Sequence, residues 1–363
     1  MIAGKEPVSR NYGLKFTVLI ITFLVVLVAS FLLGRYSVDL ISFFRIIGWK
    51  ILDMLQHVSW MEGIGFIRDM QVEKSWEEAA ETVLFQIRIP RILAAALIGA
   101  ALSVAGVAYQ GMFRNPMVSP DILGASSGAG FGAAMAILLG ASYVGISMSA
   151  FVFGLVAVFI AYTISRFSKT NQTLGMILAG MMMGALFSAG TSFVKLVADT
   201  EQTLPAITYW LMGSLNSIKP EDTTFIIFPI VLGAIPLFLL RWRINLMTVG
   251  EEEARAMGIN TTAMRLVVVI CATLLTAASV SVSGMIGWIG LVIPHFCRMI
   301  FGYDYRRLIP ASALFGAAFL IVVDDASRLL TTASIPIGIL TAFIGAPLFM
   351  YLILTGGALR RDH

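Results

Sequence analysis

Charged residues are scarce in this sequence. Lys, Arg, Asp and Glu together make up 13% of its 363 residues, whereas 58% of the residues are hydrophobic. A soluble domain carries about 25% charged residues, so this chain lacks the polar surface that would face water on every side. The scarcity of charge therefore excludes a soluble globular fold and indicates a membrane protein.

Residues that bind metals or catalyse reactions are also few, and they are scattered. The cysteines Cys271 and Cys297 lie in apolar runs, and the histidines His57, His295 and His363 are far apart in the sequence. Neither set has the spacing of a metal site. The phosphate-binding pattern G-x-x-x-x-G-K-[ST] is missing, so we do not expect the chain to bind ATP by itself. We expect no metal, no cofactor and no enzymatic activity.

The net charge of +4 does not indicate a nucleic-acid partner. The basic residues lie in short loops between apolar runs, where they set the orientation of a membrane protein. The sequence has no basic stripe with interleaved aromatic residues, which is the usual mark of nucleic-acid binding. We expect contact with membrane lipid and no nucleic acid.

Apolar runs of about 20 residues, long enough to cross a hydrocarbon core of about 30 Å, recur along the chain. They predict an all-α polytopic membrane protein that forms one domain over residues 1–363. The ten predicted spans are 16–33, 91–110, 120–140, 147–165, 174–196, 223–240, 265–283, 286–302, 308–330 and 336–355.

The distribution of Lys and Arg places both termini in the cytoplasm. The outer loops 141–146, 284–285 and 331–335 then contain no basic residue, in agreement with the positive-inside rule. In this orientation residues 34–90 form an outer connection and residues 241–264 form the longest inner loop. The basic residues on the cytoplasmic side are Arg114, Arg166, Lys169, Arg241, Arg243, Arg255, Arg265, Arg306, Arg307, Arg360 and Arg361.

The order of the spans predicts how they are arranged. Spans 2–5 and spans 7–10 form two blocks of four that run in opposite directions, which predicts an inverted pseudo-repeat. The pairs Gly128/Gly132 and Gly180/Gly184 predict close packing of helices. Residues 38–56 have helical periodicity outside the spans, and we expect them to lie along the membrane surface.

Charged residues inside the spans are concentrated in span 9. Asp324 and Asp325 lie there, and Arg328 follows one turn later, so Asp324 and Arg328 can pair on one helix face. A structural ion pair and a functional site are both open. In the functional case the aspartates would bind the proton or sodium ion of a secondary transporter, which is the rival hypothesis.

Three arginines lie on the outer side, against the inside bias. Arg88 and Arg91 flank a proline in RIPR at the outer mouth of span 2, and Arg328 lies near the outer end of span 9. Outward-facing guanidinium groups would bind the carboxylates of an acidic partner in bidentate fashion. Contact with lipid phosphate is the alternative.

The inner loop contains the sequence GEEEARAMGI at residues 250–259. Its glutamates stand at the start of a short helix, where they complement the helix dipole, and Arg255 follows. A handle for another protein and a solvated loop would both have this pattern.

With these residues the chain resembles a known family. It is similar over about residues 80–356 to the FecCD and BtuC-like permeases for iron-siderophore, haem and vitamin B12 in type II ATP-binding-cassette (ABC) importers. Five motifs carry the resemblance in order: RIPRILAAALIGAALSVAGVAYQGMFRNPMVSPDILGASSGAGFGA (88–133), WLMGS (210–214), GEEEARAMGI (250–259), SGMIGWIGLVIPHFCRMIFGYDYRRLIP (283–310) and SIPIGILTAFIGAPLFMYLI (334–353).

The resemblance implies the type II importer permease fold and the transport of ferric siderophores, with haem or cobalamin as alternative substrates. It implies a bacterial inner-membrane location and three kinds of partner: a second copy of the chain, two cytoplasmic ATPase subunits and an extracytoplasmic substrate-binding protein. The outer segment 34–87 is longer than the family's usual connection, so the docking surface is expected to be modified.

The resemblance also implies roles for individual residues. The binding protein is expected to dock at Arg88, Arg91 and Arg328. The residues expected to couple the chain to the ATPase are Gly250, Glu251, Glu252, Glu253, Ala254, Arg255 and Gly258. The residues expected to form the cytoplasmic gate are Asn115, Pro116, Met117 and Thr173.

Overall fold

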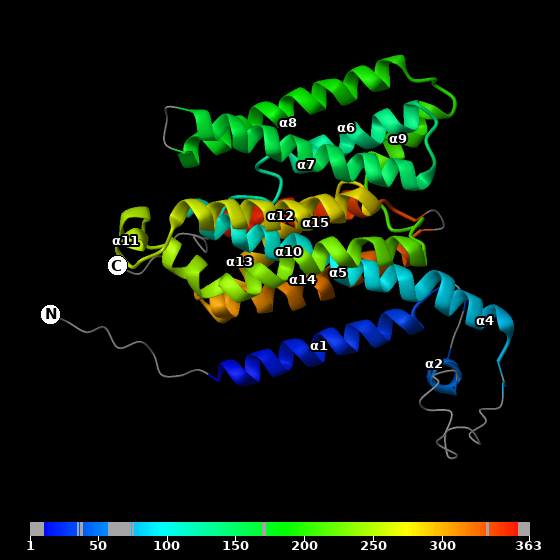
Figure 1. Cartoon of the computed structure of the whole chain (residues 1–363). Helices are drawn as coiled ribbons and strands as arrows, with labels where there is room; N and C mark the ends of the chain where they lie inside the picture. Colours follow the sequence, from blue (N-terminus) through cyan, green and yellow to red (C-terminus); the bar gives the residue numbers. More distant parts are fainter. Residues whose placement is uncertain are drawn as a thin grey trace.

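The computed structural model describes residues 11–34, 36, 39–56, 74, 76–168, 172–331 and 334–354. In these residues the regular structure is entirely helical (Figure 1). The helices are α1 (Tyr12–Leu32), α2 (Leu40–Gln56), α4 (Glu78–Thr82), the π-helical η1 (Val83–Arg88), α5 (Ile89–Phe113), α6 (Ala125–Leu138), α7 (Tyr143–Phe167), α8 (Gln172–Val197), α9 (Thr203–Leu211), α10 (Pro220–Met247), α11 (Glu251–Ala256), α12 (Thr261–Ser283), α13 (Ile289–Phe301), α14 (Tyr305–Leu329) and α15 (Ile337–Leu354).

Each of the ten predicted spans corresponds to one apolar helix. In the described part of the chain, seven helical stretches are long and apolar enough to cross a membrane, and the continuous helix 78–113 is one of them. The helices of the third, eighth and tenth predicted spans, α6, α13 and α15, are apolar but shorter. The prediction of an all-α polytopic membrane protein is therefore confirmed.

The predicted spans 120–140 and 286–302 begin too early. Helix α6 starts at Ala125 and α13 at Ile289, and they have 14 and 13 residues. A 14-residue helix is about 21 Å long, which is less than the hydrocarbon thickness of about 30 Å. Irregular backbone precedes both helices, with positive φ at Gly124 and Trp288. Such backbone is tolerated in a membrane because it is buried in protein, as Leu123 is.

The two short helices take the same place in the two predicted blocks of four. Helix α6 is the second helix of the block α5–α8, and α13 is the second helix of the block α12–α15. This correspondence agrees with two related blocks, and their inverted relation stays a prediction.

The second predicted span begins too late, because its helix starts well before the apolar run. Helices α4, η1 and α5 run continuously from Glu78 to Phe113, although the hydropathy pattern indicated a start at residue 91. Helix α9 was not predicted; it is only nine residues long, and its last two residues, Trp210 and Leu211, begin the WLMGS motif. Both errors concern helical turns that lie outside the long apolar runs.

Helix α2 lies outside the main bundle. Figure 1 shows it nearly end-on, whereas α1 and α5 run lengthwise, so α2 crosses the direction of the spans. Phe43 and Ile46 are buried on one face, while Ile41, Phe44 and Ile51 are exposed. The helical periodicity predicted for 38–56 is confirmed over residues 40–56. Its place along the membrane surface stays a prediction, and the crosswise direction and exposed apolar face agree with it.

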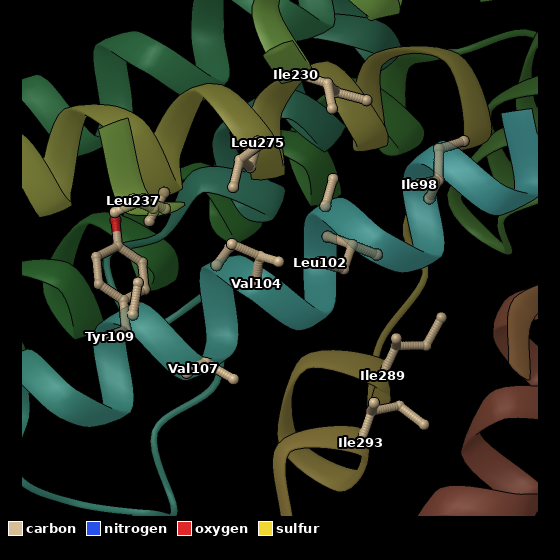
Figure 2. Packing of buried hydrophobic residues seen from close by; sticks show 14 of the residues in the cluster. Ile98, Leu102, Val104, Val107, Tyr109, Ile230, Leu237, Leu275, Ile289 and Ile293 are labelled. Carbon is tan, nitrogen blue, oxygen red and sulfur yellow. The ribbon is translucent and has the colours of Figure 1, made fainter. Parts of the chain in front are cut away.

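Helix α5 occupies the centre of the fold. Its apolar side chains contact α10, α12 and α13, as Figure 2 shows for Leu102 and Val104 among their neighbours. Gly99 and Gly106 let other helices approach its backbone. A Cβ atom at Gly106 would lie 1.9 Å from the backbone oxygen of Gly290. Close approach through small residues is the usual way in which helices pack in a membrane, where apolar burial drives association less than in water.

The two glycine pairs singled out in the sequence also lie at close contacts. A Cβ atom at Gly128 would lie 2.5 Å from the oxygen of Phe153, and one at Gly180 would lie 2.2 Å from the oxygen of Ile122. The first contact brings α6 against α7, and the second brings α8 against the loop before α6. The predicted close packing is confirmed for Gly128, Gly132 and Gly180, whereas a Cβ atom at Gly184 would make only an ordinary contact of 3.7 Å with the hydroxyl oxygen of Ser127.

Candidate functional site

The candidate residues gather in two polar clusters at opposite ends of the bundle. Arg88 stands at the start of α5, and Asn115 follows its end. A helix of 25 residues is about 37 Å long, so the clusters are separated by about the thickness of a membrane. The first, the outer cluster, consists of Arg88, Arg91, Asp324, Asp325 and Arg328. Figure 1 places α4 at that end and α11 at the other.

The outer cluster centres on the carboxylate of Asp324 in α14. Arg91 of α5 donates from Nε to both Asp324 oxygens at 2.9 Å and from Nη2 to Oδ1 at 2.8 Å. The Nε of Arg328 lies 3.4 Å from Asp324 Oδ2, so the pair predicted at i, i+4 is present. Charge-assisted bonds of this bidentate kind are the strongest hydrogen bonds in proteins, and here they join two helices.

Asp325 extends the cluster to α1. Its Oδ1 accepts a hydrogen bond of 2.7 Å from the hydroxyl of Ser30 and a further bond from Arg328 Nη2. Arg88 donates to the backbone oxygens of Phe31 and Tyr36, so the chain that leaves α1 wraps around its guanidinium group. The structure therefore brings the three predicted docking arginines together and adds two carboxylates and the end of α1.

The arginines of the outer cluster are not directed outward into open space. Arg88 and Arg91 are buried, with 3% and 8% of their surface exposed, and 12% of the Arg328 side chain is exposed. The expectation of outward-facing guanidinium groups is wrong for this state of the chain, because the nearby carboxylates and carbonyl oxygens hold them inward. Their role in docking stays a prediction.

The inner cluster is built on α11, the short helix predicted from GEEEARAMGI. Glu251 accepts hydrogen bonds from Arg255 at 2.7 Å, from Arg265 at 3.1 Å and from Thr261 at 3.4 Å. Burial raises the pKa of the Glu251 carboxyl, but the guanidinium groups of Arg265 and Arg255 outweigh burial, so this pKa lies below its ordinary value. The carboxylate is therefore charged at neutral pH and holds α11 to the start of α12.

The remaining predicted coupling residues differ in their exposure. Glu252, Glu253, Arg255 and Gly258 are exposed, whereas Ala254 is fully buried and fixes the inner face of α11. Gly250, which is buried, precedes the helix, and Gly258 has a φ of 81°, which favours glycine after a helix end. Glu252 and Glu253 are therefore the exposed carboxylates of α11.

The predicted gate residues lie beside the inner cluster. After α5 the chain turns at Arg114, which has a φ of 52°, and the side chain of Asn115 accepts from the backbone N–H of Met117 at 2.9 Å. Pro116 lies within this turn. Thr173, in the first turn of α8, lines the same small cleft as Arg114, Glu251 and Arg265. The structure thus brings Thr173 of the predicted gate and Glu251 of the predicted coupling helix together.

Sequence reasoning missed two polar residues that organise the turn after α5 and the start of α6. Gln110 is buried and donates to the oxygens of Val118 and Gly290, which fixes the turn after α5. Asp121 accepts from the backbone N–H of Ser126 at 2.7 Å at the start of α6. A glutamine in an apolar run is the only sequence signal for Gln110. Asp121 falls inside the predicted span 120–140, where its charge is the sequence signal.

Comparison with known proteins identifies the family. Residues 22–355 match the FecCD transport family. The chain belongs to the FecCD transport family. It is 42% identical over 273 residues to the molybdate import system permease protein MolB of Haemophilus influenzae, which covers 75% of this chain and 81% of MolB. It is 41% identical over 271 residues to a Helicobacter pylori permease named for iron chelatin transport, which covers 75% and 82%.

A solved structure shows the same fold for this FecCD family member. An ABC transporter of proposed metal-chelate type, in an inward-facing conformation, aligns with a TM-score of 0.81 and 36% sequence identity. The alignment covers 95% of this chain and all of the other. The chain is therefore a multi-pass permease subunit of an ABC importer. It is the membrane component that does not hydrolyse ATP, and it works with an ATPase and a binding protein.

Proposed function

We propose that this permease imports ferric siderophores, driven by ATP that a partner hydrolyses beneath it. The observation that carries the proposed energy source is the pairing of the two aspartates in span 9. Asp324 and Asp325 are already neutralised by Arg91 and Arg328, so they do not offer the free carboxylate that a driving proton or sodium ion requires. Energy must then come from a partner.

The proposed assembly is a homodimer of this chain with two ATPase subunits and one binding protein. We assign the end that carries α11 to the cytoplasm of a bacterial cell, with both termini on that side and the outer cluster outside. The distribution of basic residues supports this orientation. The exposed Glu252 and Glu253 of α11 then face the ATPase, and the Asn115–Met117 turn and Thr173 form the gate.

The outer cluster is the proposed docking site of the binding protein. Its three guanidinium groups exceed its two carboxylates, which leaves a net positive charge at the outer mouth. Glutamates of an arriving protein would compete with Asp324 and Asp325 for Arg91 and Arg328. Because Arg88 is covered by the chain after α1, docking there requires that this connection move.

Molybdate is the second candidate substrate, since the permease with 42% identity bears the name of a molybdate importer. Haem and cobalamin are further alternatives. We favour ferric siderophores because the relative with 41% identity is named for iron chelatin transport and because a bulky chelate suits a mostly apolar interior.

The substrate is tested by uptake into proteoliposomes that contain the complete complex. We expect ATP-dependent accumulation of iron-55 bound to a siderophore, and no competition by excess molybdate. A complex whose ATPase cannot hydrolyse ATP is the control and should accumulate neither. Accumulation of molybdenum-99 as molybdate, with no uptake of the iron chelate, would contradict the proposed substrate while leaving the importer function intact.

A further inference from the structure

A single arginine side chain connects the proposed coupling helix to the proposed gate. Arg265 lies in the second turn of α12, and only 3% of its surface is exposed. Its Nη2 donates to Glu251 Oε2 in α11 at 3.1 Å, and its Nη1 donates to the side-chain oxygen of Gln172 in α8. One guanidinium group thus bridges three helices.

Each partner of Arg265 is itself held in place. Glu251 also accepts from Thr261 of α12, and Arg255 of α11 donates from Nε to the Thr261 hydroxyl, so α11 is joined to α12 by several bonds. Gln172 is the first residue of α8, and its backbone oxygen accepts a hydrogen bond of 2.9 Å from Ser165 in α7. A displacement of α11 therefore acts on the beginning of α8 through Arg265.

The beginning of α8 is also where the predicted gate lies. Thr173 directly follows Gln172, and it lines one small cleft together with Arg114, Glu251 and Arg265. Arg114 begins the turn that contains Asn115. The cleft is thus enclosed by the end of α5, the start of α8, α11 and the start of α12.

We propose that Arg265 is a positioning residue that transmits the movement of α11 to the start of α8, so that ATP hydrolysis opens and closes the gate. This inference rests on the proposed coupling role of α11. The chemistry of arginine suits the task, because its planar group presents separate N–H donors to Glu251 and Gln172 at the same time. A lysine ammonium is one compact charge and cannot hold both partners in the same geometry.

The test compares substitutions of Arg265 in the reconstituted complex. We expect Arg265→Lys to reduce uptake at least about tenfold, within the usual range of coupling between sites, while the ATPase still copurifies. The number of substrate molecules transported per ATP hydrolysed should fall with it. Arg243→Gln is the matched control, because Arg243 is an exposed arginine near the end of α10, at the same end of the bundle as Arg265. This variant should transport normally.

Substitutions of Gln172 separate transmission from folding, because they leave the Arg265–Glu251 ion pair intact. Gln172→Ala removes the acceptor and should lower the ratio of transport to hydrolysis as Arg265→Lys does. Gln172→Glu retains an acceptor oxygen and should restore that ratio. Normal coupling in both Arg265→Lys and Gln172→Ala would overturn the proposal. If instead the unaltered complex shows no ATP-dependent uptake, the proposed function itself is wrong.

Discussion

Replacement of Asp324 by alanine is expected to destabilise the permease by about 3–5 kcal/mol, because it leaves buried charges without a partner. Asp324 is 1% exposed and binds both Arg91 and Arg328. Its loss would leave Arg91 with no carboxylate partner among the described residues. Thermal unfolding in detergent, followed by the loss of monodisperse protein on size-exclusion chromatography, measures the effect.

Two control variants define this result. Asp53→Ala removes a partially exposed partner of Lys50 on α2 and should change stability by less than about 1 kcal/mol. Asp324→Leu combined with Arg91→Met removes both charges of the pair and should recover much of the loss, since an apolar pair can replace a buried ion pair. Wild-type stability of Asp324→Ala alone would show that the outer cluster is not a structural element.

The double substitution Glu252→Arg with Glu253→Arg is expected to abolish transport by separating the permease from its ATPase. Both side chains are exposed at the start of α11, whereas Glu251 faces inward, so the change reverses the surface charge without breaking the inner cluster. Charge reversal across an interface costs several kcal/mol in association. Copurification of the ATPase with the tagged permease measures the result.

The matched control places the same charges at the other end of the bundle. Glu201→Arg with Glu221→Arg alters two exposed glutamates beside α9 and at the start of α10, so the ATPase should copurify normally. Full copurification by the Glu252 and Glu253 variant would contradict the assignment of α11 as the coupling helix.

Most of the membrane fold could be predicted from the apolar runs of the sequence. The ten spans and α2 follow from run length and from helical periodicity, which are local properties. The starts of α6 and α13 were placed too early because Leu123 and Ile286 are as apolar as the helices that follow them. Hydropathy records burial but does not show where buried backbone stops being helical.

The candidate sites could be predicted only in part. The charges of Asp324, Arg328 and the α11 glutamates stand out in an apolar sequence, so their importance was visible. Apart from the Asp324–Arg328 pair, the partners in both clusters were not visible, because Ser30 lies 295 residues from Asp325, and Gln172 lies 93 residues from Arg265. Contacts over such separations depend on how α1 and α8 pack. That packing leaves no periodic signal in helices whose every face is apolar.

The origin of the driving energy is tested most directly in sealed proteoliposomes that contain this chain alone. With proton and sodium gradients imposed and no ATPase present, we expect no uptake of a radiolabelled iron chelate above that of empty liposomes. Addition of the ATPase, the binding protein and enclosed ATP should produce uptake against a gradient. Uphill accumulation by the lone chain on an ion gradient would contradict the account.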